Sequence, residues 1–365
     1  MGLKCGIVGL PNVGKSTLFN ALTEAKAEAA NYPFCTIDPN VGIVTVPDQR
    51  LDEITKYIKP QKVIPTAIEF VDIAGLVAGA SKGEGLGNQF LGNIRETDAI
   101  IHVVRCFEND NVVHVDGSVD AARDIDVINT ELLLSDLESL EKRVKKNDKI
   151  LRANSKDVLL IQETAVMKKA LEALENGKPA RSVDYNEEET LLLKRLHLIT
   201  SKPVLYVCNI GEEGEEGNAH FSKVSEIANS ENNECISICS SLEAEIIELE
   251  GDEKLEFLES IGQTEPGLNR LIRKAYELLS LDTYFTAGEK EVRAWTIPHN
   301  AKAPRAAAEI HTDFEKGFIR AEVYHCDVLF ELHSEQAIKE AGKFRSEGKE
   351  YVVKDGDVMH FLFNV

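Results

Sequence analysis

The sequence predicts an α/β protein built on a doubly wound parallel sheet, with a helical arm inserted into it and a small α+β domain after it. Three observations support this prediction. Apolar, strand-like runs alternate with helical stretches, as in a doubly wound sheet. About a hundred residues, most of them helical in pattern, separate the third run from the fourth, whereas a parallel crossover needs roughly thirty. Short β-like runs around one helix follow residue 282.

The strand-like runs define the order of the predicted sheet. They cover residues 6–8, 68–71, 100–104, 204–207 and 236–238. Each is a short apolar run of the kind that forms a buried strand. We therefore assign residues 1–123 and 201–281 to one nucleotide-binding domain, and residues 282–365 to a separate α+β domain.

Residues 124–200 interrupt the first domain with a helical pattern. An apolar seam recurs there in steps of four, three, four and seven residues, which suits an antiparallel helical hairpin. Its members are Leu133, Leu137, Leu140, Val144 and Leu151. A break is expected at residues 176–179, which read Asn-Gly-Lys-Pro. We predict a coiled-coil-like arm; the alternative is that these helices simply pack on the sheet.

Residues 9–16 read Gly-Leu-Pro-Asn-Val-Gly-Lys-Ser, a complete phosphate-binding loop between a predicted strand and a predicted helix. Gly9 and Gly14 let backbone N–H groups turn inward around a phosphate. Lys15 is placed to reach the β- and γ-phosphates, and the Ser16 hydroxyl is placed to bind Mg²⁺. The helix that begins there adds the positive end of its dipole. This loop predicts a site for a nucleoside triphosphate.

A second motif, Asp72-Ile73-Ala74-Gly75, ends the second strand about sixty residues after the loop. In P-loop enzymes such an aspartate holds Mg²⁺, and the glycine N–H meets the γ-phosphate. The glycine-rich segment that follows suits a nucleotide-sensing switch, and Thr36 lies where a first switch would supply a hydroxyl to Mg²⁺. The predicted metal ligands are Ser16, Thr36 and Asp72. The predicted catalytic residues include Lys15, Thr36 and Gly75.

Residues 209–212 follow the fourth strand and read Asn-Ile-Gly-Glu, where guanine-specific enzymes carry Asn-Lys-x-Asp. The aspartate of that motif accepts two hydrogen bonds from guanine. Here Glu212 is one methylene longer and Ile210 replaces the lysine, which weakens guanine selectivity and makes ATP a candidate. Residues 240–242 are placed to line the other side of the base. The predicted nucleotide contacts are Asn12, Val13, Gly14, Lys15, Ser16, Thr17, Asn209, Ile210, Glu212, Ser240, Ser241 and Leu242.

The phosphate loop, residues 31–34, 72–77, 209–212 and 355–358 together resemble the YchF family of Obg-like ATPases. The resemblance extends over essentially the whole chain. It implies a nucleotide-binding domain of the translation-factor-related P-loop class, a helical arm and a C-terminal TGS domain with a ubiquitin-like β-grasp fold. It also implies hydrolysis of ATP in preference to GTP, association with ribosomes, and a role in translation or stress response.

The resemblance also assigns two further residues. Many P-loop GTPases place a glutamine after Asp-x-x-Gly to orient the attacking water, but Leu76 occupies that position here. The resemblance points to His114 instead; without it, His114 would be expected to be a solvated loop residue. Asn12 resembles the asparagine that helps to hold K⁺ in related enzymes, so K⁺ is a second candidate ion beside Mg²⁺.

Composition narrows the class of protein. The chain has 365 residues, 43% of them hydrophobic and 28% charged, as in soluble globular proteins, and no apolar run suits a transmembrane helix. The net charge of −21 argues against a surface that binds nucleic acid throughout. Residues 211–260 hold fifteen acidic and two basic side chains, whereas residues 124–200 and 283–365 are nearly balanced. Contact with the ribosome or RNA through those two segments stays open.

The chain has seven cysteines, an odd number, and most of them lie in apolar runs. This usage indicates reduced core residues of a cytoplasmic protein. Cys235 and Cys239 lack a second ligand pair, so zinc is not expected. We expect no signal peptide, no membrane partner and a monomer.

Two alternatives to an ATPase stay open. One is a GTPase in which Glu212 still reads guanine, and the other is a ribosome- or RNA-binding module whose nucleotide orders the switches while hydrolysis is incidental.

Overall fold

A computed structural model describes residues 3–24, 40–73, 86–109, 111–112, 114–115, 117–153 and 156–364 of the chain. The chain divides into two compact units. The first comprises Met1–Val44 and Glu69–Leu271, and the second comprises Thr45–Ile68 and Ile272–Val365. Among the described residues, no helix is long and apolar enough to cross a membrane.

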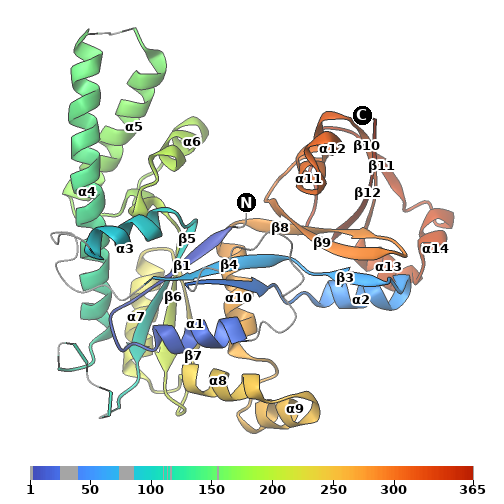
Figure 1. The fold of residues 1–365 in the computed structure, drawn as a ribbon, viewed down its shortest axis with the longest axis horizontal. Helices are drawn as coiled ribbons and strands as arrows, with labels where there is room; N and C mark the ends of the chain where they lie inside the picture. The colour runs from blue at the N-terminus through green and yellow to red at the C-terminus, as the bar shows by residue number, and fades with distance from the viewer. Residues whose placement is uncertain are drawn as a thin grey trace. The chain divides into compact units, whose positions relative to one another are not determined.

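The first unit is built on a six-stranded sheet of order β2-β4-β1-β5-β6-β7 (Figure 1). β1 pairs in parallel with β4 and β5, and the parallel pairing continues from β5 to β6 and β7. The strands are β1 (Lys4–Val8), β2 (Val41–Thr45), β4 (Ala67–Asp72), β5 (Ala99–Cys106), β6 (Val204–Ile210) and β7 (Glu234–Ile238). All five predicted strands are confirmed, and β2 is an additional strand.

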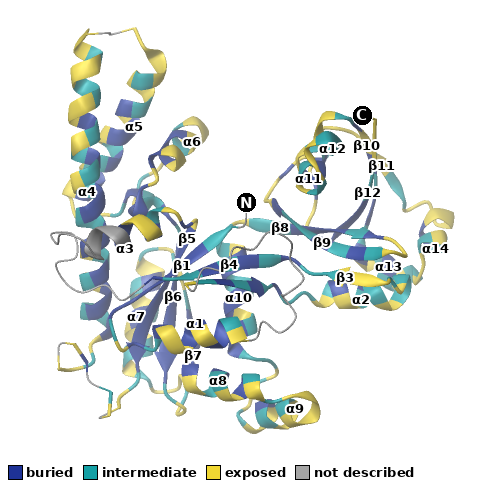
Figure 2. Cartoon of the chain, in the orientation of Figure 1, coloured by how far each residue is buried: buried dark blue, intermediate teal, exposed yellow. Residues whose placement is uncertain are grey.

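The central strands β5 and β6 are buried along their whole length (Figure 2). Both faces of a parallel sheet are usually covered by helices, which explains why these strands read as continuous apolar runs. The helices of the first unit are α1 (Lys15–Glu24), α3 (Leu86–Arg95), α7 (Ala219–Ser230), α8 (Ser240–Glu248) and α9 (Gly251–Ser260). α10 (Gly267–Leu278) begins in the first unit and continues into the second.

The stretch between β5 and β6 is helical, as predicted. It contains α4 (Ala121–Ala153), α5 (Val158–Glu175), α6 (Glu187–Leu196) and two short 3₁₀ helices, Ala180–Ser182 and Ile199–Ser201. Leu140 and Val144 of the predicted seam lie in a buried cluster with residues of α5 and α6, and Leu133 and Leu137 pack against it. α5 ends at Glu175, at the predicted break. Figure 1 shows α4 and α5 extending beyond the sheet as an arm.

The second unit is built on a mixed sheet of order β11-β10-β12-β8-β9-β3. β8 pairs in parallel with β12 and antiparallel with β9. The strands are β3 (Lys62–Ile64), β8 (Leu281–Ala287), β9 (Glu291–Pro298), β10 (Phe318–His325), β11 (Arg345–Glu347) and β12 (Asp357–Phe363). The helices are α2 (Gln49–Ile58), α11 (Ala303–Ile310), α12 (Thr312–Lys316), α13 (Cys326–Leu332) and α14 (Glu335–Glu340).

The sequence assigned residues 45–68 to the nucleotide-binding domain, but in the structure they pack in the second unit. Leu51 and Ile54 of α2 enter a buried cluster with Phe285 and Val292, and β3 extends the sheet by pairing with β9. The sequence also predicts a closing hairpin, in which residues 351–353 and 358–363 pair around a Lys-Asp-Gly-Asp turn at 354–357, but in the structure these two runs pair elsewhere. β12 pairs with β10 and β8, while Val352 forms an isolated bridge with Lys302.

Candidate functional site

The phosphate loop runs from the end of β1 into α1, as its sequence predicts. Gly14 has a φ of +91°, and a Cβ there would lie 2.0 Å from Asn209 Nδ2. A Cβ at Gly9 would lie 2.6 Å from the carbonyl oxygen of Val103. Glycine is therefore required at both positions, because the loop backbone passes directly against β5 and the Asn209 side chain.

Lys15 and Asp72 meet because β1 and β4 are neighbours, with Ile7 opposite Asp72. Lys15 is buried, and its Nζ lies 3.7 Å from Asp72 Oδ1. That carboxylate oxygen is buried and has no hydrogen-bond partner among the described residues. A buried carboxylate oxygen needs a donor or a cation to offset its lost hydration. Asp72 thus has the free acceptor that a metal ion beside Lys15 would use.

A cavity of about 630 Å³ opens over the phosphate loop, a size that suits a nucleotide. Ten of the predicted contacts line it: Asn12, Gly14, Lys15, Ser16, Thr17, Asn209, Ile210, Glu212, Ser240 and Ser241. The sequence did not predict Phe107, Glu108, Asn109, Val112, Gly211 and Glu213, which also line it. Val13 and Leu242 were predicted but are not among the lining residues. Thr36 and Gly75 lie outside the described residues.

Asn209 fixes the loops around this cavity. The side chain is buried; its Nδ2 donates to the Val13 carbonyl at 2.9 Å, and its Oδ1 accepts from the Ser240 N–H at 3.0 Å. Both halves of the amide therefore bind main chain, one in the phosphate loop and one at the start of α8. Asn209 acts on the nucleotide site by positioning these two segments against each other.

Arg105 holds in place one wall of the cavity that the sequence did not predict, formed by Phe107, Glu108, Asn109 and Val112. The residue is fully buried, and its guanidinium donates to the carbonyl oxygens of Phe107, Asn109 and Val112 at 3.1, 3.2 and 2.9 Å. It also lies over the Phe107 ring, 4.6 Å from the centroid. The only signal in the sequence was a charged residue inside an apolar strand, where a buried charge must be paired.

His114 follows this wall and is buried, so the expectation of a solvated residue is wrong. Its Nε2 lies 2.8 Å from Asp124 Oδ2, near the start of α4, and both side chains are almost inaccessible to solvent. The carboxylate can hold the ring in one tautomer and orientation. His114 is not among the described residues that line the cavity.

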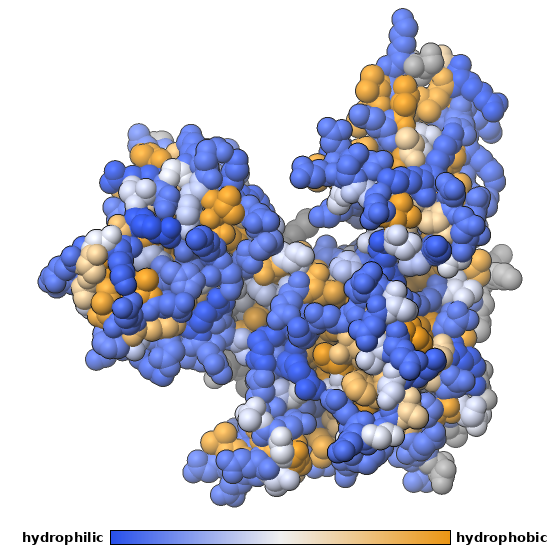
Figure 3. All heavy atoms as spheres, turned by 180° about the vertical axis from the view of Figure 1, so that it is seen from behind, coloured by the Kyte–Doolittle hydropathy of each residue, from blue (hydrophilic) through white to orange (hydrophobic). Residues whose placement is uncertain are grey.

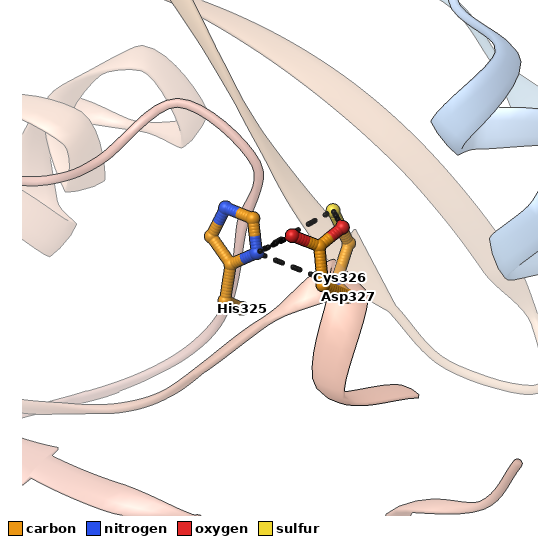
Figure 4. Close-up of side chains that lie close together, drawn as sticks. All are labelled: His325, Cys326 and Asp327. Carbon is orange, nitrogen blue, oxygen red and sulfur yellow. Dashed lines mark hydrogen bonds and ion pairs between the residues drawn. The ribbon is translucent and has the colours of Figure 1, made fainter. Parts of the chain in front are cut away.

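A second cluster of polar side chains lies in the second unit, at His325, Cys326 and Asp327 (Figure 4). Its geometry is that of a helix cap. His325 Nδ1 accepts from the Asp327 N–H at 3.3 Å, and Nε2 lies 3.0 Å from the Asp355 carbonyl oxygen. Burial raises the pKa of the Cys326 thiol to about 12, which keeps it protonated and a poor metal ligand. This histidine is thus structural. The six described cysteines are free, and Cys35 lies outside the described residues.

Comparison with known proteins identifies the family. A family model described as a 50S ribosome-binding GTPase matches residues 4–161, and the YchF-GTPase_C model, described as a protein of unknown function, matches residues 281–364. The ribosome-binding ATPase YchF of Pasteurella multocida (strain Pm70) is 59% identical over 365 residues, covering 100% of both chains. The chain belongs to the YchF family.

Two further YchF proteins agree with this assignment. The ribosome-binding ATPase YchF of Bacillus subtilis (strain 168) is 57% identical over 368 residues, covering 100% of both chains. A solved structure of the Schizosaccharomyces pombe YchF GTPase shares 39% identity with a TM-score of 0.89, covering 99% of this chain and 98% of its own. The YchF fold expected from the sequence is confirmed. The names of the YchF relatives are divided between ATPase and GTPase.

Proposed function

We propose that this chain is a Mg²⁺-dependent ATPase that prefers ATP to GTP and acts as a ribosome-associated conformational switch in translation or stress response. The observation that carries the proposal is a nucleotide-sized cavity over a complete phosphate loop, whose base side holds Ile210 and Glu212. Relatives that are 57–59% identical and named ribosome-binding ATPases support the activity and the partner. We infer that the switch acts as a monomer in the cytoplasm.

Base selection rests on two side chains at the end of β6. A guanine site pairs an aspartate with the N1–H and the exocyclic amine, two donors side by side. Adenine offers one donor and one acceptor there, and a carboxylate accepts only. The exposed Glu212 is longer and less fixed than that aspartate, and the buried Ile210 offers no charge. The site therefore lacks the fixed aspartate by which a guanine-specific site rejects ATP.

The described residues fit Mg²⁺. Asp72 Oδ1 is buried without a hydrogen-bond partner among them, and the Ser16 side chain is exposed to the cavity. Ser16 and Asp72 would hold the ion together with Thr36. When bound, Mg²⁺ supplies charge that neutralises the phosphate oxygens. Asn12, which lines the cavity, is proposed to hold K⁺ as a second cation.

Hydrolysis is proposed to occur by direct attack of water on the γ-phosphate. Lys15 and the N–H groups of the phosphate loop bind the β- and γ-phosphates and stabilise the charge of the transition state. The Gly75 N–H is proposed to contact the γ-phosphate. His114 is proposed to orient the attacking water, with Asp124 holding its ring. Because His114 does not line the cavity, this role requires its loop to move when nucleotide binds.

The decisive experiment measures equilibrium binding of labelled ATP and GTP with Mg²⁺, in the natural chain and in the Ile210→Lys, Glu212→Asp double variant. We expect tighter ATP binding in the natural chain, and a gain in GTP affinity of roughly tenfold, ~1.4 kcal/mol, in the variant. The single variant Glu213→Asp is the control, since that neighbour also lines the cavity. Tighter GTP binding by the natural chain would exclude the ATP preference.

A GTP-specific switch is the second candidate. It is favoured by the name of the S. pombe relative and by the GTPase family model. A nucleotide-gated ribosome- or RNA-binding module with incidental hydrolysis is the third, and Leu76 favours it because leucine cannot orient water. Equal, weak binding of ATP and GTP in the experiment above would support this third candidate.

A further inference from the structure

We propose that the second unit carries a binding site for a small phosphorylated molecule, in a cavity at the carboxyl end of β10. The cavity has a volume of about 380 Å³, which lies in the usual range for small-molecule sites. Three cationic side chains and one buried carboxylate line it: Lys343, Arg345, Lys354 and Asp357. The site is separate from the nucleotide cavity of the first unit, so the proposal goes beyond the ATPase activity proposed above.

The pairing of three strands brings these side chains together. β10 lies between β11 and β12 in the sheet. Arg345 begins β11, and Asp357, which begins β12, lies opposite His325 at the end of β10. Lys343 comes just before β11, and Lys354 comes shortly before β12. Two separate parts of the chain therefore deliver their charged side chains to one end of this sheet.

Hydrogen bonds hold the floor of this cavity in place. The Tyr351 hydroxyl accepts a hydrogen bond from Arg345 Nη2 at 3.1 Å and donates one to Asp357 Oδ2 at 2.7 Å. The Arg345 guanidinium also lies over the Tyr351 ring, 5.4 Å from its centroid. The Lys354 N–H donates to the same carboxylate oxygen at 2.9 Å. These groups are positioned before a ligand binds, which lowers the entropy cost of binding.

The positive charge of the cavity is available to an anion. Lys354 is exposed and forms no ion pair with any described residue. Lys343 pairs with Glu331 at 2.9 Å. Arg345 pairs with Glu347 at 3.3 Å. Both pairs are partly exposed and therefore weak, and neither glutamate is among the described residues that line the cavity. A phosphate group, with up to two negative charges and three acceptor oxygens, can replace these partners.

The buried carboxylate indicates a second feature of the ligand. Asp357 is fully buried, and its Oδ1 has no hydrogen-bond partner among the described residues. Arg345 Nη2 lies 3.7 Å from this oxygen, too far for a hydrogen bond. A buried oxygen needs a donor, and a metal ion is disfavoured because three cationic side chains line the same cavity. A hydroxyl group on the phosphorylated ligand supplies the missing donor.

The surroundings favour a small molecule over a nucleic acid. Residues 326–350, which include α13, α14 and β11, contain six acidic and four basic side chains. A nucleic acid backbone would extend beyond the cavity and meet this excess of negative charge. A small anion that sits inside the cavity meets only the three cations and the Asp357 carboxylate.

The other lining side chains do not suit a protein partner. Val328 is the one aliphatic side chain among the described residues that line the cavity. His325 also lines it, but its Nδ1 accepts from the Asp327 N–H and its Nε2 lies 3.0 Å from the Asp355 carbonyl oxygen (Figure 4). Figure 3 shows one face of the second unit as mostly hydrophilic, with hydrophobic side chains scattered over it. Protein interfaces centre on clustered apolar and aromatic anchors, so a polar small molecule is the better fit.

The test measures binding of ribose 5-phosphate by titration calorimetry, because this probe combines a phosphate group with hydroxyl donors. One equivalent of a non-hydrolysable ATP analogue with Mg²⁺ is added first, so that the phosphate loop is occupied. We expect saturable binding with a dissociation constant of about 1 mM or lower. Ethyl phosphate lacks the hydroxyl groups and should bind roughly threefold or more weakly, because Asp357 Oδ1 then stays without a donor.

The variant Lys343→Gln, Lys354→Gln removes two exposed cations from the cavity. We expect its dissociation constant for ribose 5-phosphate to rise about tenfold or more, because two charge-assisted contacts are lost. The matched control is Lys339→Gln, Lys349→Gln, two exposed lysines of the same unit that are not among the lining residues. It changes the net charge equally and should bind the probe like the natural chain. Circular dichroism of both variants verifies their folding.

Weaker binding in the cavity variant, with unchanged binding in the control, supports the proposal. Equal weakening in both variants would overturn it, because net charge alone would then explain the binding. The absence of saturable binding up to about 10 mM probe, or equal affinity for ethyl phosphate, would also overturn it. A short RNA duplex that binds more tightly than the probe, and loses this affinity in the cavity variant, would overturn it in favour of a nucleic acid.

Discussion

At the scale of single residues, Arg105 shows how a buried charge shapes the nucleotide site. The guanidinium holds three carbonyl oxygens of a loop whose residues line the cavity. The Arg105→Met variant should leave these carbonyls without their donor and free the loop. We expect ATP affinity to fall about tenfold, ~1.4 kcal/mol, and the free energy of unfolding to fall by about 2–4 kcal/mol.

Titration calorimetry and urea unfolding would measure the two effects. Arg320→Met, on an exposed arginine of the second unit, is the control and should change neither. Unchanged ATP affinity in Arg105→Met would show that the loop keeps its position without the guanidinium.

A second residue-scale prediction concerns His102, which is buried in β5 against the Tyr206 ring. Burial, with a smaller contribution from Arg181, lowers the pKa of His102 to about 3. The unfolded chain takes up this proton near pH 6.5 and the folded chain does not. The contribution of His102 to stability is thus complete above pH ~6.5 and is lost as the pH falls toward 3.

The His102→Phe variant removes this titration while keeping an aromatic ring beside Tyr206. Between pH 7 and pH 4.5 the natural chain should lose about 2–3 kcal/mol more of its free energy of unfolding than the variant. Urea unfolding at the two pH values measures the difference. An equal loss in both proteins would mean that His102 is protonated in the folded state.

At the scale of elements, the strands of the first sheet could be predicted because each is a continuous apolar run in a parallel sheet. The site could be predicted where motifs end such strands, because the carboxyl ends of parallel strands meet at one edge. Lys15 follows β1, Asn209 lies near the end of β6, and Ser240 follows β7. All three line one cavity.

Elements without a motif could not be placed from the sequence. α2 has an ordinary apolar stripe and β3 has only three residues. No feature of their own sequence indicates that these two elements join the second unit. Their position depends on the fit of Leu51 and Ile54 to a cluster of residues more than two hundred positions away in the chain. The wall that Arg105 holds was missed for a different reason: its contacts are local, but they are with main-chain carbonyl oxygens, which no residue type in the sequence marks.

At the scale of the whole molecule, the chain combines two units that have separate cores. The described residues of the nucleotide cavity all belong to the first unit. Ligand binding stabilises the part of a protein that folds to form the site. A nucleotide should therefore stabilise the first unit directly, while the second unit gains nothing from contacts in that cavity.

Calorimetry should accordingly show two thermal transitions, of which only one responds to nucleotide. A non-hydrolysable ATP analogue at a hundred times its dissociation constant, with Mg²⁺, adds about 2.7 kcal/mol. This should raise the transition of the first unit by about 5–10 °C.

Removing Mg²⁺ with EDTA should reverse most of the shift, because Asp72 and Ser16 would lose the ion through which they hold the phosphates. Lys15→Ala should abolish the shift and so identify the responding transition. A single transition, or two that shift equally, would show that the units unfold together.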